Sequence, residues 1–404
     1  MSRFFPYDPD QAYLLPPNVK DVLGADHLCF HVHRVVEALD VSEFEKAYGD
    51  EGRLAYPPRM MLKVWLYAFC LQVSWTRRLE QRVREDLAFR YLAGGLAPDH
   101  KTLSEFLRRH RNAINGVFTQ VLEIARKAGM VRLGHVAIDS TRVKANASRR
   151  SVVSADQLAR DQRARDRRQV RKFQQKASAP DPNEEGGVSL SADQQQSLNG
   201  QIDGVSPGLK PLARGRRNEI SLTDPDSRFL RAPEGWVLGY TADLAVSDDH
   251  FIVATRVTQN TTDNDSLLAM ADEVEQQCKT RPEKITADAG FFSGRALDGL
   301  RDRGMQAYVP DPNLAHEMNT GVQAGGKIGR RTIRDPEHLR VRERLRTPEG
   351  RKIYQRRQAV VEPVFGVLKE QRGLRRFRRR GLAAVGTEWL MVAIAYNIGR
   401  MRNA

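Results

Sequence analysis

The sequence has few of the features that mark disulfide-linked, membrane-spanning or secreted proteins. Its 404 residues include only three cysteines, Cys29, Cys70 and Cys278, which lie far apart and predict reduced thiols rather than a disulfide framework. No uninterrupted apolar run reaches the roughly 18 residues of a membrane helix. The first residues, MSRFFPYDPDQ, have no apolar stretch behind their arginine, so we expect no secretion signal. The expected location is the cytoplasm, in association with the nucleoid, and no membrane partner is expected.

Nucleotide-binding and zinc-binding motifs are also missing. The chain has no phosphate-binding loop of the type G-x4-G-K-S/T, which argues against the use of ATP. Its nine histidines and three cysteines show no spacing typical of zinc ligands.

Negative charge is scarce relative to positive charge. The chain has 65 Lys and Arg against 50 Asp and Glu, a net charge of +15, and a pI near 9.9. Residues 327–380 alone contain 19 Lys and Arg against 6 Asp and Glu, a net +13. Apolar residues are interleaved with these charges, which favours a folded, amphipathic segment over a disordered tail. A strongly basic chain suits a polyanionic partner, because neutralising phosphates releases counterions.

The first 130 residues are expected to be helical. Tyr56-Pro57-Pro58 precedes an apolar helix, a second is expected over 76–92, and a third over 103–129, which ends at a glycine. Short helices with basic polar faces fit a helix-turn-helix-like DNA-binding domain. They fit a plain helical bundle almost as well.

Strands are expected from residue 131 onward. Short apolar runs predict strands at 133–139, 236–247, 251–258, 283–288 and 305–310. Helices are expected over 265–279 and from Ser293 to Gly304, and again from Arg340 onward. The three residues 248–250 predict a hairpin turn, and His135 is expected to be a core or edge residue of its strand.

A segment poor in apolar periodicity interrupts this pattern. Residues 148–220 are rich in Arg, Gln, Asp and Ser and include a basic helical stretch at 157–176. We expect a low-complexity insertion without strands, outside the core.

The order of elements predicts an α/β fold of the ribonuclease H-like type, a mixed sheet flanked by helices, with an all-α N-terminal domain. The predicted domains are a helical DNA-binding domain (1–130), a catalytic domain (131–147 and 221–404) and the insertion (148–220).

Two carboxylates stand where predicted strands end. Asp139 closes LGHVAID and Asp288 closes EKITAD. In an open α/β sheet, ligands gather beyond the carboxyl ends of adjacent parallel strands. Two carboxylates there could bind Mg²⁺, and a third from a helix would complete a site for two ions. Glu362, inside the basic region, is the natural third member.

The words around these acids resemble a known family. They read HVAIDSTRVKANAS, ITADAGFFS and RRQAVVEPVFGVLKEQRGLRRFRRRG, and the N-terminal half adds YPPRMMLKVWLYAF and REDLAFRYLAGGLAPDHKTLSEFLRRH. These motifs resemble bacterial insertion-sequence transposases of the Asp-Asp-Glu (DDE) type, in the IS-five-like superfamily and its IS-eleven-eighty-two-like branch. The resemblance covers most of the chain except about 150–220.

The resemblance implies an enzyme that binds the terminal inverted repeats of a mobile element and cuts and joins DNA strands. Asp139, Asp288 and Glu362 would bind two Mg²⁺ or Mn²⁺ ions, and Lys369, seven residues after Glu362, would lie on the same helix face and reach a phosphate. The partners would be the element ends and target DNA, with the protein a dimer or larger on DNA.

The remaining expected DNA contacts are less regular. The family pattern has a tyrosine and an arginine seven and four residues before the glutamate, whereas Tyr354 and Arg357 lie one residue earlier, so they could equally be surface residues. The basic run is expected to contact phosphates through Arg372, Arg375, Arg376, Arg378, Arg379 and Arg380. Two other functions remain open: a non-catalytic DNA-binding regulator derived from a transposase, and a ribonuclease H-like DNA nuclease.

Overall fold

The computed structural model describes residues 18–49, 54–154, 160, 219–232, 235–321, 327–328, 331–333 and 335–403. Internal contacts divide the chain into two units: Met1–Asn146 together with Phe229–Ala404, and Ala147–Arg228. The boundary predicted at residue 130 falls inside the first unit, so the three-domain division stays a prediction.

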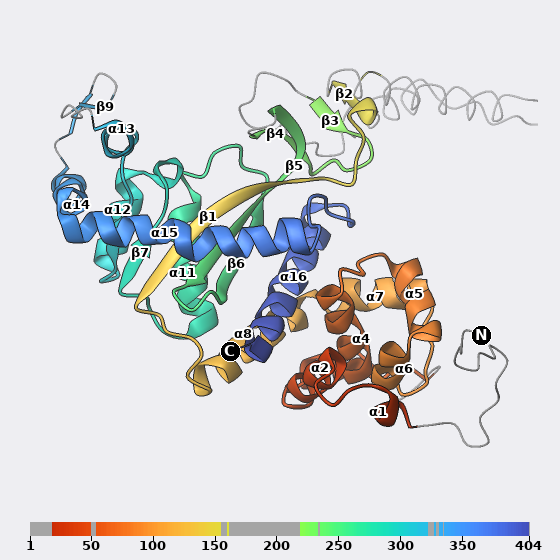
Figure 1. Ribbon diagram of the computed structural model, residues 1–404. Helices are drawn as coiled ribbons and strands as arrows, with labels where there is room; N and C mark the ends of the chain where they lie inside the picture. Colours follow the sequence, from red (N-terminus) through yellow and green to blue (C-terminus); the bar gives the residue numbers. More distant parts are fainter. Residues whose placement is uncertain are drawn as a thin grey trace, which may run out of the picture. The chain divides into compact units, whose positions relative to one another are not determined.

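The N-terminal region is helical, as predicted (Figure 1). Its helices are α1 (Val19–Val22), α2 (Leu28–Glu37), α3 (Ser42–Glu45), α4 (Pro58–Cys70), α5 (Thr76–Glu85), α6 (Leu87–Ala93), α7 (His100–Arg109) and α8 (Arg111–Lys127). Helix α4 is buried over almost its whole length, and its sequence is apolar apart from Arg59 and Lys63.

Two of the predicted helices are each broken in two. The helix expected over 76–92 stops at Asp86, because the Asp86 carboxylate accepts hydrogen bonds from the N–H groups of Ala88 and Phe89 and so begins α6. The helix expected over 103–129 breaks at His110, whose buried ring packs against Phe44.

A six-stranded mixed sheet follows. Its strands are β1 (His135–Lys144), β4 (Arg228–Ala232), β5 (Gly235–Ser247), β6 (Ile252–Thr258), β7 (Lys284–Thr286) and β8 (Gln306–Tyr308), in the order β4-β5-β1-β7-β8 with β6 also paired to β5. Strand β1 runs antiparallel to β5 and parallel to β7, and β7 runs parallel to β8. This is the ribonuclease H-like arrangement expected from the sequence.

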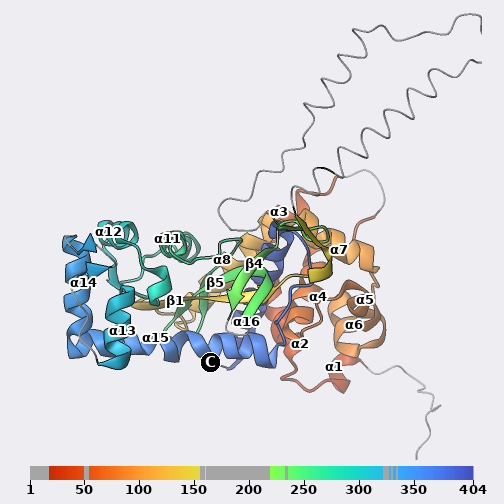
Figure 2. The ribbon, with the colours of Figure 1, turned by 90° about the horizontal axis from the view of Figure 1, so that it is seen from above.

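Helices cover both faces of this sheet. Figure 2 shows α11 (Ser266–Cys278) and α12 (Gly294–Asp302) on one side of β1 and α15 (Pro348–Gly366) on the other. The remaining helices are α13 (Pro312–Thr320), α14 (Pro336–Arg346) and α16 (Leu382–Asn403). A short 3-10 turn, η2 (Ala289–Phe291), follows β7, and α15 passes directly into a π-helical turn, η3 (Val367–Gln371). A two-stranded sheet joins β9 (Lys327–Ile328) to β10 (Arg331–Thr332).

Three sequence predictions need correction. The strand expected to end at Asp139 continues to Lys144, so Asp139 lies in its middle. The strand expected to end at Asp288 stops two residues earlier, and Asp288 instead caps η2. The segment expected to have no strands contains β2 (Val152–Ser154), which follows the 3-10 turn η1 (Arg149–Ser151) and pairs with β3 (Glu219–Ser221). The helix expected over 157–176 falls outside the described residues, apart from residue 160.

Helix α16 is the longest helix among the described residues and a central part of the core. By length and composition it could cross a membrane, but 67% of its most apolar window is buried inside the protein. It packs against α4, α8 and β6. The apolar run in the sequence is therefore explained by burial in the protein core.

Asn397 fastens α16 to the sheet edge. Its side-chain oxygen accepts the N–H of Ile252 at 2.9 Å, and its side-chain nitrogen donates to the Ile252 carbonyl at 2.8 Å. Asn397 is fully buried, so water cannot replace either bond.

We expect Asn397→Leu to lower the free energy of unfolding by about 2–5 kcal/mol, because it leaves two buried backbone groups unpaired. Urea titration followed by circular dichroism measures this. The same change at exposed Asn403, on the same helix, should have little effect. Equal losses in both variants would contradict the role given to Asn397.

Candidate active site

Asp139 and Asp288 are brought together by the parallel pairing of β1 with β7. Ala137 lies opposite Thr286 in the register, and Asp139 and Asp288 each follow two residues later. Because side chains alternate along a strand, Asp139 points to the same face as Ala137. Asp288 interacts electrostatically with Asp139. The expectation that these two acids meet beside two parallel strands is supported by this geometry.

The Asp139 carboxylate is largely enclosed. Burial raises its pKa to about 6, the Arg357 guanidinium opposes this rise, and Asp288 adds to it. The N–H of Ser140 donates to Asp139 Oδ1 at 2.8 Å. This carboxyl group therefore takes up a proton far more readily than an exposed aspartate does.

Arg357 supplies the opposing positive charge. Its Nη1 lies 3.1 Å from Asp139 Oδ2, and the residue is 9% exposed. The Tyr354 ring lies beside it, with the guanidinium carbon 5.9 Å from the ring centroid. Sequence reasoning expected Arg357 to contact DNA or lie on the surface, whereas the structure places it against a carboxylate of the candidate site.

Glu362 does not join the two aspartates in this structure. It lies five residues after Arg357 on α15, which turns it about 140° away around the helix, and it is exposed. Within the described ranges, no group of three His, Cys, Asp or Glu side chains is close enough to hold a metal ion. The structure thus assembles two members of the predicted triad and leaves the third facing solvent.

Asp263 is a neighbour of the site that sequence reasoning missed. Arg142 Nη2 donates to Asp263 Oδ2 at 3.1 Å, and Arg142 Nη1 donates to the Ser140 hydroxyl at 2.9 Å. A Cβ on Gly290 would lie 3.0 Å from Asp288 Oδ1 and 3.5 Å from Asp263 Oδ2. Hydrogen bonds therefore link Asp139 through Ser140 and Arg142 to Asp263, and Asp263 lies near Asp288. In the sequence, the only signal for Asp263 is the polar segment TTDND at 261–265.

Lys369 lies beyond α15, in the π-helical turn. Its ammonium group lies 5.7 Å from the Phe365 ring centroid. The expected alignment with Glu362 presumes a regular α-helix, whereas the helix widens from Val367. Its proposed phosphate contact stays a prediction.

The six arginines of the basic run differ in their surroundings. Arg375, Arg376 and Arg380 are exposed. Arg372 lies over the Tyr396 ring and Arg379 over the Trp65 ring, and burial lowers the pKa of both guanidinium groups. Arg378 lies over the Trp75 ring, 4.9 Å from its centroid. The expectation that all six contact phosphates therefore does not fit Arg372 and Arg379, which help to pack the core.

Glu388 on α16 holds the backbone of this run in place. It is 1% exposed and accepts hydrogen bonds from the N–H groups of Arg378 and Arg379 at 2.9–3.0 Å. Burial raises its pKa. The buried carboxylate thus fixes the backbone between the exposed arginines, Arg375 and Arg376 on one side and Arg380 on the other.

His135 and the 248–250 turn are structural, as expected. His135 is 5% exposed, with Nδ1 2.7 Å from Asp248 Oδ1 and Nε2 2.9 Å from the Thr286 hydroxyl. The turn joins β5 to β6, and His250 adopts a positive φ of 60° there. The cysteines are free.

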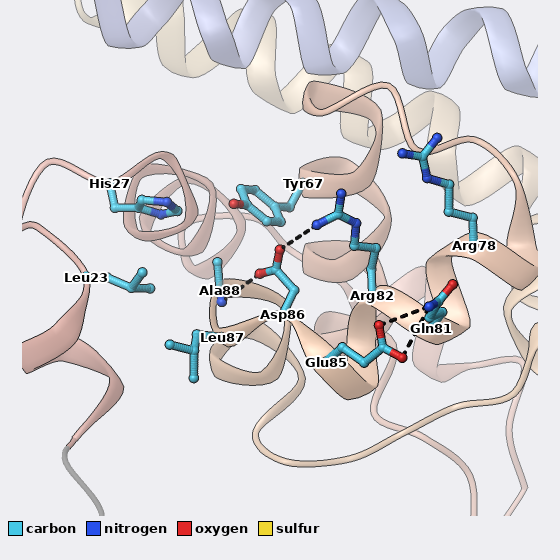
Figure 3. A pocket seen from close by; sticks show the side chains of 10 residues that line it. All are labelled: Leu23, His27, Tyr67, Arg78, Gln81, Arg82, Glu85, Asp86, Leu87 and Ala88. Carbon is cyan, nitrogen blue, oxygen red and sulfur yellow. Dashed lines mark hydrogen bonds and ion pairs between the residues drawn. The ribbon is translucent and has the colours of Figure 1, made fainter. Parts of the chain in front are cut away.

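A pocket of about 650 Å³ lies away from this site, among the N-terminal helices (Figure 3). Two pairs of its lining residues interact: Arg82 with Asp86 at 3.2 Å, and Gln81 with Glu85 at 3.0 and 3.2 Å. No nucleophile and general base face each other in it, so we assign it no chemistry.

Asp243 is a second buried carboxyl group, on the opposite face of the sheet from Asp139. It is fully buried, and the nearby Ser266 hydroxyl, which favours the charged form, offsets only part of the effect of burial. Burial raises its pKa from 3.8 to about 7, and nearby Asp263 adds to the rise. The folded chain therefore keeps a proton here that the unfolded chain releases.

Asp243 should make the protein less stable as pH rises. Between about pH 4 and pH 7 only the unfolded chain has lost this proton, so the free energy of unfolding falls by on the order of 1.4 kcal/mol per pH unit. Asp243→Asn should remove this dependence, as measured by urea titrations across that range. Exposed Asp302→Asn is the control and should leave the slope unchanged. An unaltered slope in Asp243→Asn would show that this group does not hold the proton.

Arg357 should control the protonation of Asp139. We expect Arg357→Gln to raise the pKa of Asp139 above about 6, because the nearest opposing charge is lost. Carboxyl carbon NMR of the metal-free protein measures it. Arg356→Gln is the control, since Arg356 Nε pairs with Asp248 instead, at 3.1 Å. An Asp139 pKa that moves equally in both variants would contradict a specific pair.

Comparison with protein families gives two matches. Residues 218–398 match the model described as "Transposase DDE domain", and residues 17–109 match "Transposase domain (DUF772)". The first match includes Asp288 and Glu362 and begins after Asp139. Searches of curated proteins and of solved structures found no match. With its helical first domain and a ribonuclease H-like sheet that bears the paired aspartates, the chain is a DDE-type transposase of the IS-five-like kind.

Proposed function

We propose that this transposase binds the terminal inverted repeats of a mobile element and catalyses metal-dependent DNA strand cleavage and strand transfer. We assign it to the IS-eleven-eighty-two-like branch on its sequence motifs. The observation that carries the proposal is the parallel register of β1 and β7, after which Asp139 and Asp288 each follow two residues later and interact electrostatically. A regulator that only binds DNA would have no need for two repelling carboxylates in a half-buried site.

The two aspartates fit a hard divalent cation. Mg²⁺ and Mn²⁺ favour carboxylate oxygens, with water and phosphate completing the shell. Burial and the neighbouring Asp288 raise the pKa of Asp139, and a cation between the two carboxylates would relieve that repulsion. In the proposed site Asp139, Asp288 and Glu362 would hold two ions, which would stabilise the charge on the attacking and leaving oxygens.

The chain's own residues position the DNA around these acids. Arg357 and Tyr354 border Asp139, where a phosphate brought to the site would meet the guanidinium group. The exposed Arg375, Arg376 and Arg380 would hold the flanking backbone. We propose that the N-terminal helices read the element end, with α5 as a candidate because its surface carries Arg77, Arg78, Arg82 and Arg84.

The proposed assembly is a homodimer or larger complex on DNA, because two element ends must be joined together, and the proposed location is the cytoplasm at the nucleoid. A ribonuclease H-like nuclease is the alternative that the acids alone would permit. The N-terminal match to a second transposase domain favours transposition.

Cleavage and binding should separate by mutation. Asp139→Asn, Asp288→Asn and Glu362→Gln should each lower Mg²⁺-dependent cleavage of a duplex carrying the element end by at least 100-fold. DNA affinity should stay equal or rise, because negative charge is removed. Gel-shift and single-turnover cleavage assays measure the two properties, with exposed Asp302→Asn as the control. Wild-type cleavage by Asp288→Asn would refute the active-site assignment.

The exposed arginines should contribute mainly to salt-dependent binding. Replacing Arg375, Arg376 and Arg380 with Gln should reduce the slope of log affinity against log salt by up to about 0.9 per lost contact, alike for specific and random duplexes. A triple Gln variant of Arg281, Arg301 and Arg303, all in ion pairs elsewhere, is the control. Full affinity in the first variant would mean that these arginines are only a solvated face.

A further inference from the structure

The position of Glu362 on α15 poses a geometric problem for the proposed site. In a regular helix, a residue four positions after Arg357 faces nearly the same way, and a residue five positions after it does not. The residue at the fourth position is Val361, which is fully buried. Glu362, at the fifth position, is exposed. Arg357 and Glu362 therefore cannot both face Asp139 while this segment remains α-helical.

We propose that the π-helical turn at Val367–Gln371 is a movable one-residue register shift that brings Glu362 into the site. A π-turn takes one extra residue into a helical turn, so residues five apart come to lie one above the other. A π-turn between Arg357 and Glu362 would replace Val361 with Glu362 beside Asp139 and Asp288. This inference rests on the proposed function, in which Glu362 is the third metal ligand.

Pro363 makes this stretch of α15 easy to rearrange. It lies inside the helix, has no N–H to donate to the Ala359 carbonyl, and its ring crowds that carbonyl. A wide turn ending at Glu362 would relieve the steric contact between the Pro363 ring and the Ala359 carbonyl, because that carbonyl would no longer face the ring. Pro363 acts as a positioning residue, since it influences the site only through the rotation of Glu362.

The surroundings of the segment determine the cost of the shift. Ala359, Glu362 and Pro363 are all exposed, whereas Val364 and Phe365, which lie between Glu362 and the present wide turn and would rotate with it, are buried. A Cβ on Gly366 would have no neighbour within 4 Å, which leaves space where the wide turn now begins. The shift would reduce the burial of Val361 and Val364 and break the contact of His250 Nδ1 with the Val360 carbonyl at 3.1 Å. Such a cost favours the observed register until the carboxylate gains a cation to bind.

The first test moves the carboxylate instead of the helix. The double variant Val361→Glu, Glu362→Gln places a carboxylate in phase with Arg357 in the observed register. Full-length protein without DNA is titrated with Mn²⁺ alone, and free Mn²⁺ is followed by electron paramagnetic resonance. We expect at least tenfold tighter binding than in wild type. The matched control, Ala359→Glu with Glu362→Gln, puts the same charge on the exposed face and should give no gain.

The second test replaces Pro363, which interrupts the hydrogen bonding of α15. Pro363→Ala restores the missing N–H donor, so we expect a higher Tm and slower amide hydrogen exchange over 359–367. Single-turnover cleavage should fall at least tenfold with unchanged DNA affinity, and adding Val361→Glu should restore it. Pro348→Ala is the control, because Pro348 lies in the first turn of the same helix, where no donor is lost.

The outcomes distinguish the register shift from the proposed function. If Glu362→Gln alone cuts DNA normally, the assignment of Glu362 fails. If Glu362→Gln is inactive but Pro363→Ala cuts at the wild-type rate, only the register shift is overturned. The same holds if wild-type protein without DNA binds Mn²⁺ as tightly as the Val361→Glu, Glu362→Gln variant and loses that affinity in Glu362→Gln.

Discussion

The parallel pairing of β1 with β7 is the constraint on which the site depends. Ala137 lies opposite Thr286, and side-chain alternation turns Asp139 to the same face as Ala137. Asp288, which follows the end of β7, interacts electrostatically with Asp139. Burial raises the pKa of Asp139 to about 6, and repulsion from Asp288 adds to the rise. The guanidinium group of Arg357 offsets part of that rise. The position of α15 over this face therefore has an electrostatic as well as an apolar basis.

Much of this arrangement could be predicted from the sequence. The apolar runs before Asp139 and Asp288 indicated strands, and the intervening helix indicated a crossover and hence a parallel pair. The second half of β1, STRVK, was missed because its polar side chains contact buried polar partners such as Asp263. A strand whose polar side chains face a polar cluster inside the protein has the same residue types as a turn exposed to water, so the sequence does not distinguish the two.

Two features could not be predicted: which residues of α15 face the aspartates, and which arginines between 372 and 380 are buried. Spacing shows which residues share a helix face only if the helix is regular, and η3 shows that this one is not. The arginines from 372 to 380 look equivalent in sequence. Their difference comes from the rings of Trp65, Trp75 and Tyr396, which are distant along the chain and which the fold brings under some of them. The local sequence around these arginines does not indicate such long-range contacts.

The position of α16 has a consequence for the order in which the protein can form. The helix packs against α4 and α8 on one side and β6 on the other, yet the ribosome makes it after every other described element. The apolar surfaces of the N-terminal helices and of the sheet that contact α16 therefore stay exposed to solvent until Leu382–Asn403 has been synthesised. A polypeptide arrested before this helix would hold both aspartates but would lack the core that keeps them in place. The two aspartates therefore reach their final surroundings only after Leu382–Asn403 has packed against the other elements.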